Sequence, residues 1–374
     1  MIIEQKGKQT MSDLLTIQNA IQNSHADLLK KSNVVSVGCG YKTCSGEKTK
    51  DLAILVGVSE KMPSVSIMSA DVIPFSIENI PVDVVPMGII RAHSKKKRTP
   101  AQAPPAVQSP EQVKTLADLD PTQRFRPIFP GISIGHYAIT AGTFSCVVLK
   151  DGKEMILSNN HILANSNNAQ IGDNILQPGS YDAGTSSDVI ATLYEFIPIV
   201  MQGSDPPPRP PGGTCGIAKG TAKIANALSK LFGRTHRLMA YNSAQATTNY
   251  VDAAVAVPLS TIQMSREIAE IGQPIGIAEA ALGMQVQKYG RTTKYTTGEV
   301  LQVMAIVDVQ YGESEIARFT NQIVLGPMSA GGDSGSAVLN MNKELVGLLF
   351  AGSDQTTIIN PIQKVFEALN LTLP

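Results

Sequence analysis

The chain has 374 residues and equal numbers of basic and acidic side chains, 31 Lys and Arg against 31 Asp and Glu. This length allows two or three domains, and a hydrophobic content of 43% is enough to bury sizeable cores. A formal net charge of zero gives no global attraction to nucleic acid or to an anionic membrane, and the absence of Trp weakens any base-stacking interpretation.

The first residues and the cysteines indicate a compartment. The start of the chain lacks the long apolar run and the small-residue cleavage site of a signal peptide, and no apolar run approaches the ~18 residues needed to span a bilayer. Four cysteines are too few for a disulfide framework, and Cys39 and Cys44 have no second Cys/His pair nearby to complete a zinc site. We therefore expect a soluble, reducing, cytoplasmic protein with free thiols and no metal, cofactor, membrane or nucleic-acid partner.

Residues 1–92 have the pattern of a small α+β domain. Apolar residues recur at helical spacing over residues 12–31, where Ser12 and Asp13 are candidate caps. Three runs rich in β-branched residues follow, separated by Gly, Pro and charged turns, and are expected to be strands: Val34–Gly40, Leu52–Val58 and Val82–Val85.

Residues 93–126 have the composition of a linker. Four basic residues, 95–98, precede a segment rich in Pro and Ala. Such a basic run also occurs in import signals and in nucleic-acid contacts, but a solvated linker is the simpler interpretation.

From about residue 127 to residue 374, short apolar segments alternate with Gly, Asn and Asp turns, which is typical of an all-β barrel architecture. The expected strands are Ile132–Thr140, Ser145–Leu149, Met155–Ser158, Val189–Leu193, Val251–Val257, Val286–Tyr289, Glu299–Val309, Gln322–Leu325, Ser336–Leu339 and Leu345–Phe350. A Pro-rich insertion at about 203–240, with a possible helix over Ile217–Phe232, interrupts them, and a helix over Ile362–Leu369 is expected near the end.

The segment Gly331-Gly332-Asp333-Ser334-Gly335-Ser336 could present an activated serine. Glycine at 332 allows the dihedrals that aim its N–H at an oxyanion, and the N–H of Ser334 would be the second donor. Asp333 would support the loop through a buried hydrogen bond or ion pair.

A serine needs a base and the base needs an orienting group. Of five histidines, only His161 follows a β-like segment in the polar context Ser-Asn-Asn-His-Ile-Leu. Asp252 precedes the apolar run Ala-Ala-Val-Ala-Val, where a carboxylate is costly without a partner such as an imidazole N–H. Asp182 and Asp188 lie nearer to His161 in sequence and remain alternatives.

These motifs, in the order His161, Asp252, Ser334, resemble those of trypsin-like serine proteases of the chymotrypsin fold, in the bacterial form. The resemblance covers residues 127–374, where Lys288–Gly298 is similar to the opening hairpin of the second barrel. It implies a double β-barrel, a His-Asp-Ser triad acting through an acyl-enzyme, protein or peptide substrates, and no cofactor.

The resemblance also implies a substrate-binding strand. Gly347–Gly352 is similar to the family's strand that lines the specificity pocket and pairs with the substrate backbone. The residues expected at this position are Met328, Ser329, Phe350, Ala351, Gly352 and Ser353. A trypsin would have Asp where this chain has Met328, so cleavage after Lys or Arg is not implied. The cysteine pair that brackets the nucleophile in secreted members is missing as well.

We therefore expect a serine endopeptidase whose proteolysis is regulated by residues 1–92 or by processing in the linker. The alternative is a protease fold that has lost catalysis and serves as a peptide-binding or scaffold protein. The N-terminal region would be a regulatory or partner-binding domain, a removable pro-segment, or a constitutive fused domain.

Overall fold

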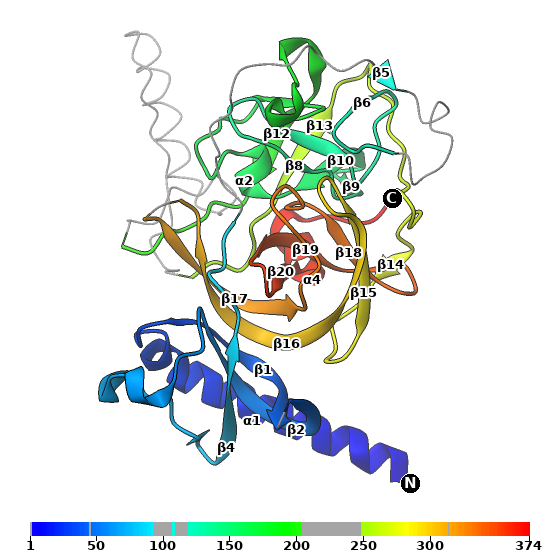
Figure 1. Ribbon diagram of the computed structural model, residues 1–374. Coiled ribbons are helices and arrows are strands. Elements are labelled where there is room, and N and C mark those ends of the chain that lie inside the picture. The colour runs from blue at the N-terminus through cyan, green and yellow to red at the C-terminus, as the bar shows by residue number, and fades with distance from the viewer. Residues whose placement is uncertain (1, 45, 93–106, 109–118, 204–247, 313) are drawn as a thin grey trace, which may run out of the picture.

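The computed structural model describes residues 2–44, 46–92, 107–108, 119–203, 248–312 and 314–374. The basic run 95–98, the Pro-rich insertion after residue 203 with its expected helix Ile217–Phe232, Cys215, His93 and His236 lie outside these residues. Figure 1 shows two β-structures stacked above an N-terminal α+β region, which confirms the expected fold class.

One of the two β-structures is a sheet of seven strands in the order β8-β7-β11-β12-β13-β10-β9. Because β8 and β9 belong to one run of chain, residues 142–150, the two ends of this order meet and the sheet closes into a barrel. We call it the first barrel. Its strands are β7 (Ser133–His136), β8 (Gly142–Thr143), β9 (Val147–Lys150), β10 (Lys153–Ser158), β11 (Asn174–Leu176), β12 (Val189–Phe196) and β13 (Ala254–Pro258).

The other β-structure, the second barrel, has six strands in the order β15-β18-β19-β20-β17-β16, and a further β15–β16 pairing closes it. Its strands are β15 (Gln285–Gly290), β16 (Lys294–Gln310), β17 (Ile316–Leu325), β18 (Ala337–Asn340), β19 (Glu344–Gly352) and β20 (Thr357–Pro361). The short strand β14 (Gly276–Ile277) pairs with β19. Of these strands, β14 and β20 were not predicted from the sequence.

The N-terminal region continues the sheet of the second barrel. Helix α1 (Ile2–Leu28) packs on β1 (Val34–Cys44) and β2 (Glu47–Val58), with Ile17, Ile21 and Leu28 buried. β2 pairs in parallel with β4 (Ile80–Pro86), which also pairs with β3 (Ser76–Ile77). β1 pairs antiparallel with β16, so one hydrogen-bonded sheet runs from the second barrel into this region.

The last part of the expected linker packs against the first barrel. Strand β6 (Arg124–Phe125) pairs with β5 (Val107–Gln108), and the side chain of Phe125 is fully buried. The backbone N–H of Phe125 donates to Gln177 Oε1 at 2.9 Å. Phe125, within the expected linker, therefore packs with the core of the first barrel.

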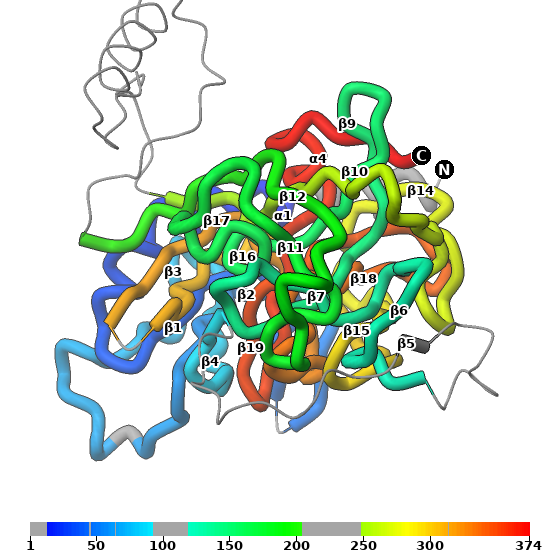
Figure 2. The backbone as a smooth tube through the Cα atoms, turned by 90° about the horizontal axis from the view of Figure 1, so that it is seen from above, coloured from blue at the N-terminus to red at the C-terminus, as the bar shows by residue number. Residues whose placement is uncertain are grey.

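Helix α4 (Ile362–Leu369) has the predicted bounds and returns the chain to the first barrel. After it, Leu149 and Thr372 exchange two backbone hydrogen bonds of 2.7 and 3.0 Å. Figure 2 shows this C-terminal segment beside β9. The segment between the C-terminal helix and residue 374 therefore ties the two barrels together.

Several predicted boundaries were wrong, including that of β17, which begins at Ile316 and not at Gln322. The first helix begins at Ile2 and not at residue 12, because residues 2–11 are mostly strong helix formers such as Glu, Gln, Lys and Met. The strand expected over Ile132–Thr140 ends at His136, where the N–H of Ile139 bonds back to His136 O. The strand expected over Val251–Val257 starts at Ala254.

Candidate active site

His161 lies in the short helix α2 (Asn160–Leu163), directly after β10. The ladder of β10 ends where Ser158 pairs with Ala254 of β13, and the polar residues after Ser158 turn the chain into this helix. Asn159 Nδ2 donates to the backbone O of Asp252 at 2.8 Å. The end of β10 and the start of β13 are thus joined at the point where His161 and Asp252 leave them.

Asp252 is fully buried and accepts two hydrogen bonds from His161. The backbone N–H of His161 donates to Oδ1 at 3.2 Å, and His161 Nδ1 lies 2.6 Å from Oδ2. The backbone N–H of Asp252 donates to Asn360 Oδ1 at 3.0 Å, which removes Asp252 from the strand ladder. The carboxylate therefore fixes both the backbone and the ring of His161.

Tyr311 is a third partner of this carboxylate that the sequence analysis missed. Its hydroxyl donates to Asp252 Oδ2 at 2.6 Å, and its ring meets the ring of His161 edge to face with centroids 6.0 Å apart. Burial and the neighbouring carboxylate raise the pKa of Tyr311 well above its usual value, so the hydroxyl stays a neutral donor. Tyr311 directly follows β16, and no local motif marks it.

Ser334 lies in a loop that is pressed against the first barrel. Gly335 has φ +96°, and a Cβ there would lie 2.2 Å from Thr143 O and 2.3 Å from Ser158 Oγ. The N–H of Thr143 donates to Ser334 O at 2.7 Å. Only glycine allows this approach, so the loop brings Ser334 to the end of the strand that leads into His161.

The backbone N–H groups of Gly332 and Ser334 donate no hydrogen bond within the described part of the chain. Gly332 has φ +101°, a left-handed conformation that favours glycine. Its carbonyl accepts from Thr143 Oγ1 at 2.9 Å, which holds the peptide in place. Two N–H donors that make no hydrogen bond within the described residues and are separated by one residue can bind an anion, as an oxyanion hole requires.

The serine and the histidine are not hydrogen-bonded to each other. Ser334 Oγ donates to the backbone O of Phe350 at 3.3 Å, and His161 Nε2 is buried with no hydrogen-bond partner among the described residues. A buried unsatisfied nitrogen is costly and is uncommon outside functional sites. Asp252 therefore fixes the imidazole through Nδ1, whereas the buried Nε2 makes no hydrogen bond among the described residues.

Asp333 has a buried cation as its partner, Lys288 of β15. Lys288 Nζ lies 3.6 Å from Asp333 Oδ2, and both side chains are fully buried. Burial lowers the pKa of Lys288, and the charge of Asp333 opposes that shift. Asp333 also accepts from the backbone N–H of Thr292 at 2.8 Å and from Thr293 Oγ1 at 2.6 Å. An internal lysine thus neutralises the carboxylate next to Ser334.

The two alternative aspartates have other partners. Asp182 forms a bidentate ion pair with Arg291, whose Nε lies 2.9 Å from Oδ2. Asp188 accepts from Arg124 Nε at 2.7 Å and closes a capping box with Thr185. Neither forms a hydrogen bond or ion pair with His161, so Asp252 is the carboxylate that the fold brings to this ring.

The expected substrate-binding residues are found on and around β19. Met328, Phe350 and Ala351 are buried in the apolar clusters of the second barrel. Ser329 Oγ lies 2.7 Å from Thr357 Oγ1, beside Gly352.

Ser353 and Gly352 bond to residues of the N-terminal region. The hydroxyl of Ser353 donates to Met87 O, and Gly352 exchanges two backbone hydrogen bonds with Arg91. The strand expected to hold a substrate is therefore in contact with the chain's own residues.

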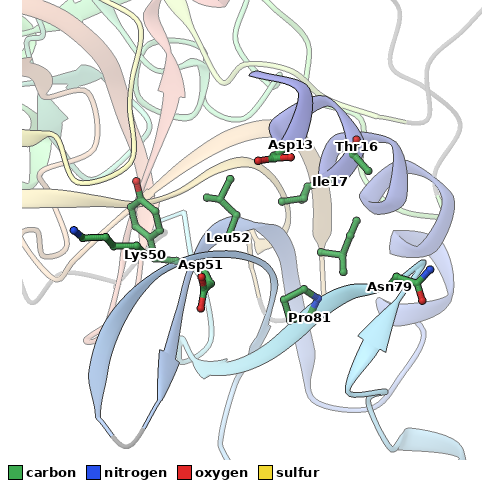
Figure 3. Close-up of a pocket in the computed structure, with 10 residues that line it drawn as sticks. Asp13, Thr16, Ile17, Lys50, Asp51, Leu52, Asn79 and Pro81 are labelled. Atoms are coloured by element: carbon green, nitrogen blue, oxygen red, sulfur yellow. The ribbon is translucent and has the colours of Figure 1, made fainter. Parts of the chain in front are cut away.

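A separate hollow of about 630 Å³ lies in the N-terminal region, between α1 and the β1–β2 hairpin (Figure 3). Its lining mixes charged and apolar side chains from α1, β2 and the β3–β4 turn, including Asp13, Ile17, Lys50, Asp51 and Asn79. It contains none of the expected site residues.

Among the described residues, no helix has both the length and the apolar character needed to cross a membrane. The described cysteines Cys39, Cys44 and Cys146 are free thiols. Burial raises the pKa of Cys39 and of Cys146 to about 12. These two thiols therefore stay protonated at neutral pH and are poor nucleophiles.

Comparison with known proteins gives a family match for part of the chain. The trypsin family model matches residues 231–371, a range that includes Asp252 and Ser334. A search of curated proteins gave no match.

Similar solved structures include a glutamic acid-specific serine protease that uses a histidine triad in substrate binding, with 18% identity, 66% of this chain and 100% of that chain covered, and a TM-score of 0.41. Protease A of Thermobifida fusca has 15% identity, 66% and 97% coverage and a TM-score of 0.40. The chymotrypsin of Cellulomonas bogoriensis has 14% identity, 66% and 98% coverage and a TM-score of 0.40. Residues 231–371 therefore match the trypsin family, and the two barrels with an additional N-terminal α+β region have the architecture of the chymotrypsin fold.

Proposed function

We propose that the protein is a serine endopeptidase that cleaves protein or peptide substrates through His161, Asp252 and Ser334. The observation that carries the proposal is the buried imidazole of His161, which is bonded to Asp252 through Nδ1 and has an open Nε2. A base in this state can take the proton of a serine hydroxyl. The neighbouring loop supplies that serine.

In the proposed reaction, Ser334 Oγ turns from Phe350 O toward His161 Nε2 by rotation about its Cα–Cβ bond. His161 takes the hydroxyl proton as Ser334 Oγ attacks the substrate carbonyl, and the N–H groups of Gly332 and Ser334 bind the oxyanion. His161 then gives the proton to the leaving amine. Water enters, His161 takes its proton, and hydrolysis of the acyl-Ser334 ester regenerates the enzyme.

Asp333 and Asp252 have supporting roles in this proposal. Asp252 keeps Nδ1 protonated and stabilises the imidazolium that forms during attack. Asp333, neutralised by Lys288, holds the loop that carries the oxyanion donors. Because this internal ion pair is present, the loop does not need a freed N-terminus as a partner.

Proteome-derived peptides incubated with the purified full chain test the assignment. We expect new N-termini with the wild type and none with Ser334→Ala or His161→Ala. Cleavage that persists in Ser334→Ala would refute the role of Ser334. The same comparison gives the cleavage motif, for which Met328, Ser329, Phe350, Ala351, Gly352 and Ser353 are the proposed determinants.

A peptide-binding protein without catalysis is the second candidate. It is favoured by the hydrogen bond of Ser334 Oγ to Phe350 O in place of one to His161. A fluorophosphonate probe separates the candidates, because only an activated serine reacts with it.

The proposal includes a regulatory role for residues 1–92, with 93–126 as the connecting segment and 127–374 as the protease-like unit. The β1–β16 pairing supports it, because it couples this region to the strand that ends beside Tyr311. Intact masses of wild type and Ser334→Ala after prolonged incubation test self-processing in the linker. Identical full-length masses would reject it under those conditions.

A further inference from the structure

The last residues of the N-terminal region, 87–92, form a short segment that lies against the second barrel. Met87 follows β4 and is held by a hydrogen bond from its N–H to Val58 O at 2.8 Å. Its carbonyl accepts from Thr356 Oγ1 at 3.2 Å and from the hydroxyl of Ser353. The segment is thus anchored next to the end of β19.

Beyond Met87 the segment is extended and lies between two strands. Arg91 N–H donates to Gly352 O at 2.9 Å, and Gly352 N–H donates to Arg91 O at 3.0 Å, an antiparallel pairing with β19. On the other side, Gln310 N–H donates to Ile90 O at 2.9 Å and Ala92 N–H donates to Gln310 O at 3.1 Å. We call the space between Gly352 and Gln310 the strand slot.

The side chains in the strand slot alternate between buried and exposed positions. Ile90 and Ala92 are each only 1% exposed and belong to the apolar cluster that includes Tyr311 and Phe350. Arg91 is exposed, and its Nε donates to Gln310 Oε1 at 3.2 Å. This alternation is that of a strand with one buried face. The slot therefore takes an aliphatic side chain, then any side chain, then a small one.

The strand slot leads to the nucleophile. In the antiparallel register that pairs Arg91 with Gly352, the position opposite Phe350 is two residues beyond Arg91. Phe350 O is the acceptor of the Ser334 hydroxyl. A peptide that follows this register therefore runs toward Ser334 as it leaves the slot.

Resting on the proposed function, we propose that residues 87–92 block the substrate-binding strand β19 in the intact chain by occupying the strand slot, and that a peptide must have the pattern aliphatic–any–small to replace them. Main-chain pairing to an exposed strand edge supplies the affinity, and the two buried side chains supply the selectivity. Because the segment is part of the same chain, its effective concentration is in the millimolar range. A peptide substrate must displace it.

Binding of a fluorescein-labelled hexapeptide, Met-Gly-Ile-Ile-Arg-Ala, tests this without any turnover when all proteins carry Ser334→Ala. Adding Arg91→Pro removes the N–H that bonds to Gly352 and should open the slot. We expect the peptide to bind this double variant at least tenfold more tightly than Ser334→Ala alone. Arg91→Ala is the matched control, because it keeps the backbone N–H and C=O and loses only the exposed hydrogen bond from Arg91 Nε to Gln310 Oε1. Its affinity should be much closer to that of the parent than to that of the Arg91→Pro protein.

Equal binding to the folded Arg91→Pro protein and its parent would overturn the proposal. A peptide with Asp at the Ile90 position must also bind at least tenfold more weakly, and undiminished binding would refute the aliphatic subsite. Ile90→Asp in the protein is the second way to empty the slot if Arg91→Pro does not fold.

Amide exchange in the unmodified chain needs no variant. The N–H groups of Arg91 and Gly352 should have the same protection factor, because one opening exposes both, and unrelated protection factors would contradict the occupied slot. None of these readouts requires Ser334 to react. A negative result would therefore count against the occupied strand slot and not against the proposed catalysis.

Discussion

Tyr311 shows how much of this site depends on one hydroxyl. The fully buried Asp252 Oδ2 accepts hydrogen bonds from His161 Nδ1 and from the Tyr311 hydroxyl, each at 2.6 Å. A buried carboxylate with good donors is held in one orientation, whereas removing a donor leaves part of its charge unpaired. Tyr311 is therefore a positioning residue for His161.

Replacing Tyr311 by Phe should lower kcat about tenfold and leave KM within about twofold. A hydrogen bond to a charged group contributes ~1.5–3 kcal/mol, and a tenfold change in rate corresponds to ~1.4 kcal/mol. Peptide hydrolysis by the full chain is the measurement. Tyr289→Phe is the matched control, because the Tyr289 hydroxyl is also buried but has no hydrogen-bond partner among the described residues. Equal kcat values for the two variants would refute the role of Tyr311.

At the scale of elements, the contact between the nucleophile loop and the first barrel depends on Gly335. A Cβ at this position meets Thr143 O and Ser158 Oγ, and φ is +96°. Both obstacles are held by hydrogen bonds, because Ser158 Oγ donates to Thr143 O at 2.8 Å and the N–H of Thr143 donates to Ser334 O at 2.7 Å.

Gly335→Ala should therefore destabilise the chain by more than the ~1–2 kcal/mol that a left-handed alanine costs, and should abolish activity. Gly152→Ala is the control, since Gly152 has φ +73° and no atom within 4 Å of the added Cβ. Urea unfolding of both variants gives the comparison. A Gly335→Ala protein as stable as Gly152→Ala would contradict the close approach.

Asp188 gives the first barrel an acid-sensitive contact. Burial alone would raise its pKa, but hydrogen bonds from Thr185 and from Arg124 outweigh burial and hold the pKa below 3.8. The stabilisation is therefore present above pH 3.8 and is lost as pH falls through the lower pKa of the folded state. Arg124 belongs to the segment that packs before β7, so this loss should loosen its attachment.

Asp188→Asn should lower the free energy of unfolding at neutral pH and make it depend less on pH between about pH 5 and pH 2. Denaturant unfolding across this range is the measurement. Parallel curves for wild type and variant, with a constant offset, would show that Asp188 does not carry the acid dependence.

The sequence predicted the site where short motifs carry the information. His161, Asp252 and Ser334 each lie within three residues of a strand in a recognisable local context, and the fold brings His161 and Asp252 within hydrogen-bond distance. Tyr311 and Lys288 could not be found in this way, because their partners are 59 and 45 positions away and depend on barrel closure. The presence of a lysine within the predicted strand Val286–Tyr289 was the one available signal for a buried ion pair.

At the scale of the whole molecule, the sequence suggests a boundary after residue 92, but the β-sheet of the structure continues across it. The composition change near residue 93 predicts two separate units, but β1 pairs with β16 through residues such as Val37 and Ile306, both fully buried. Strand pairing between distant segments leaves no local pattern. A change in composition indicates a connecting segment between two parts of the chain. It does not show whether strands of the two parts pair in one sheet.

Amide exchange should reveal this shared sheet. The N–H groups of β1 that pair with β16 should exchange about as slowly as those of β17, because both strands flank β16 in one hydrogen-bonded sheet. Exchange of β1 that is orders of magnitude faster than that of β17 would contradict a common cooperative unit.

The most direct test of the proposed enzyme is covalent labelling of the full chain with a fluorophosphonate, read as intact mass and as the modified peptide. We expect one added phosphonyl group on Ser334 in the wild type, none in Ser334→Ala, and a loss of labelling in His161→Ala. Arg91→Pro should label faster than the wild type, because the strand slot is then open. If neither the wild type nor a folded Arg91→Pro protein is labelled, Ser334 is not an activated nucleophile and the chain is not a serine protease.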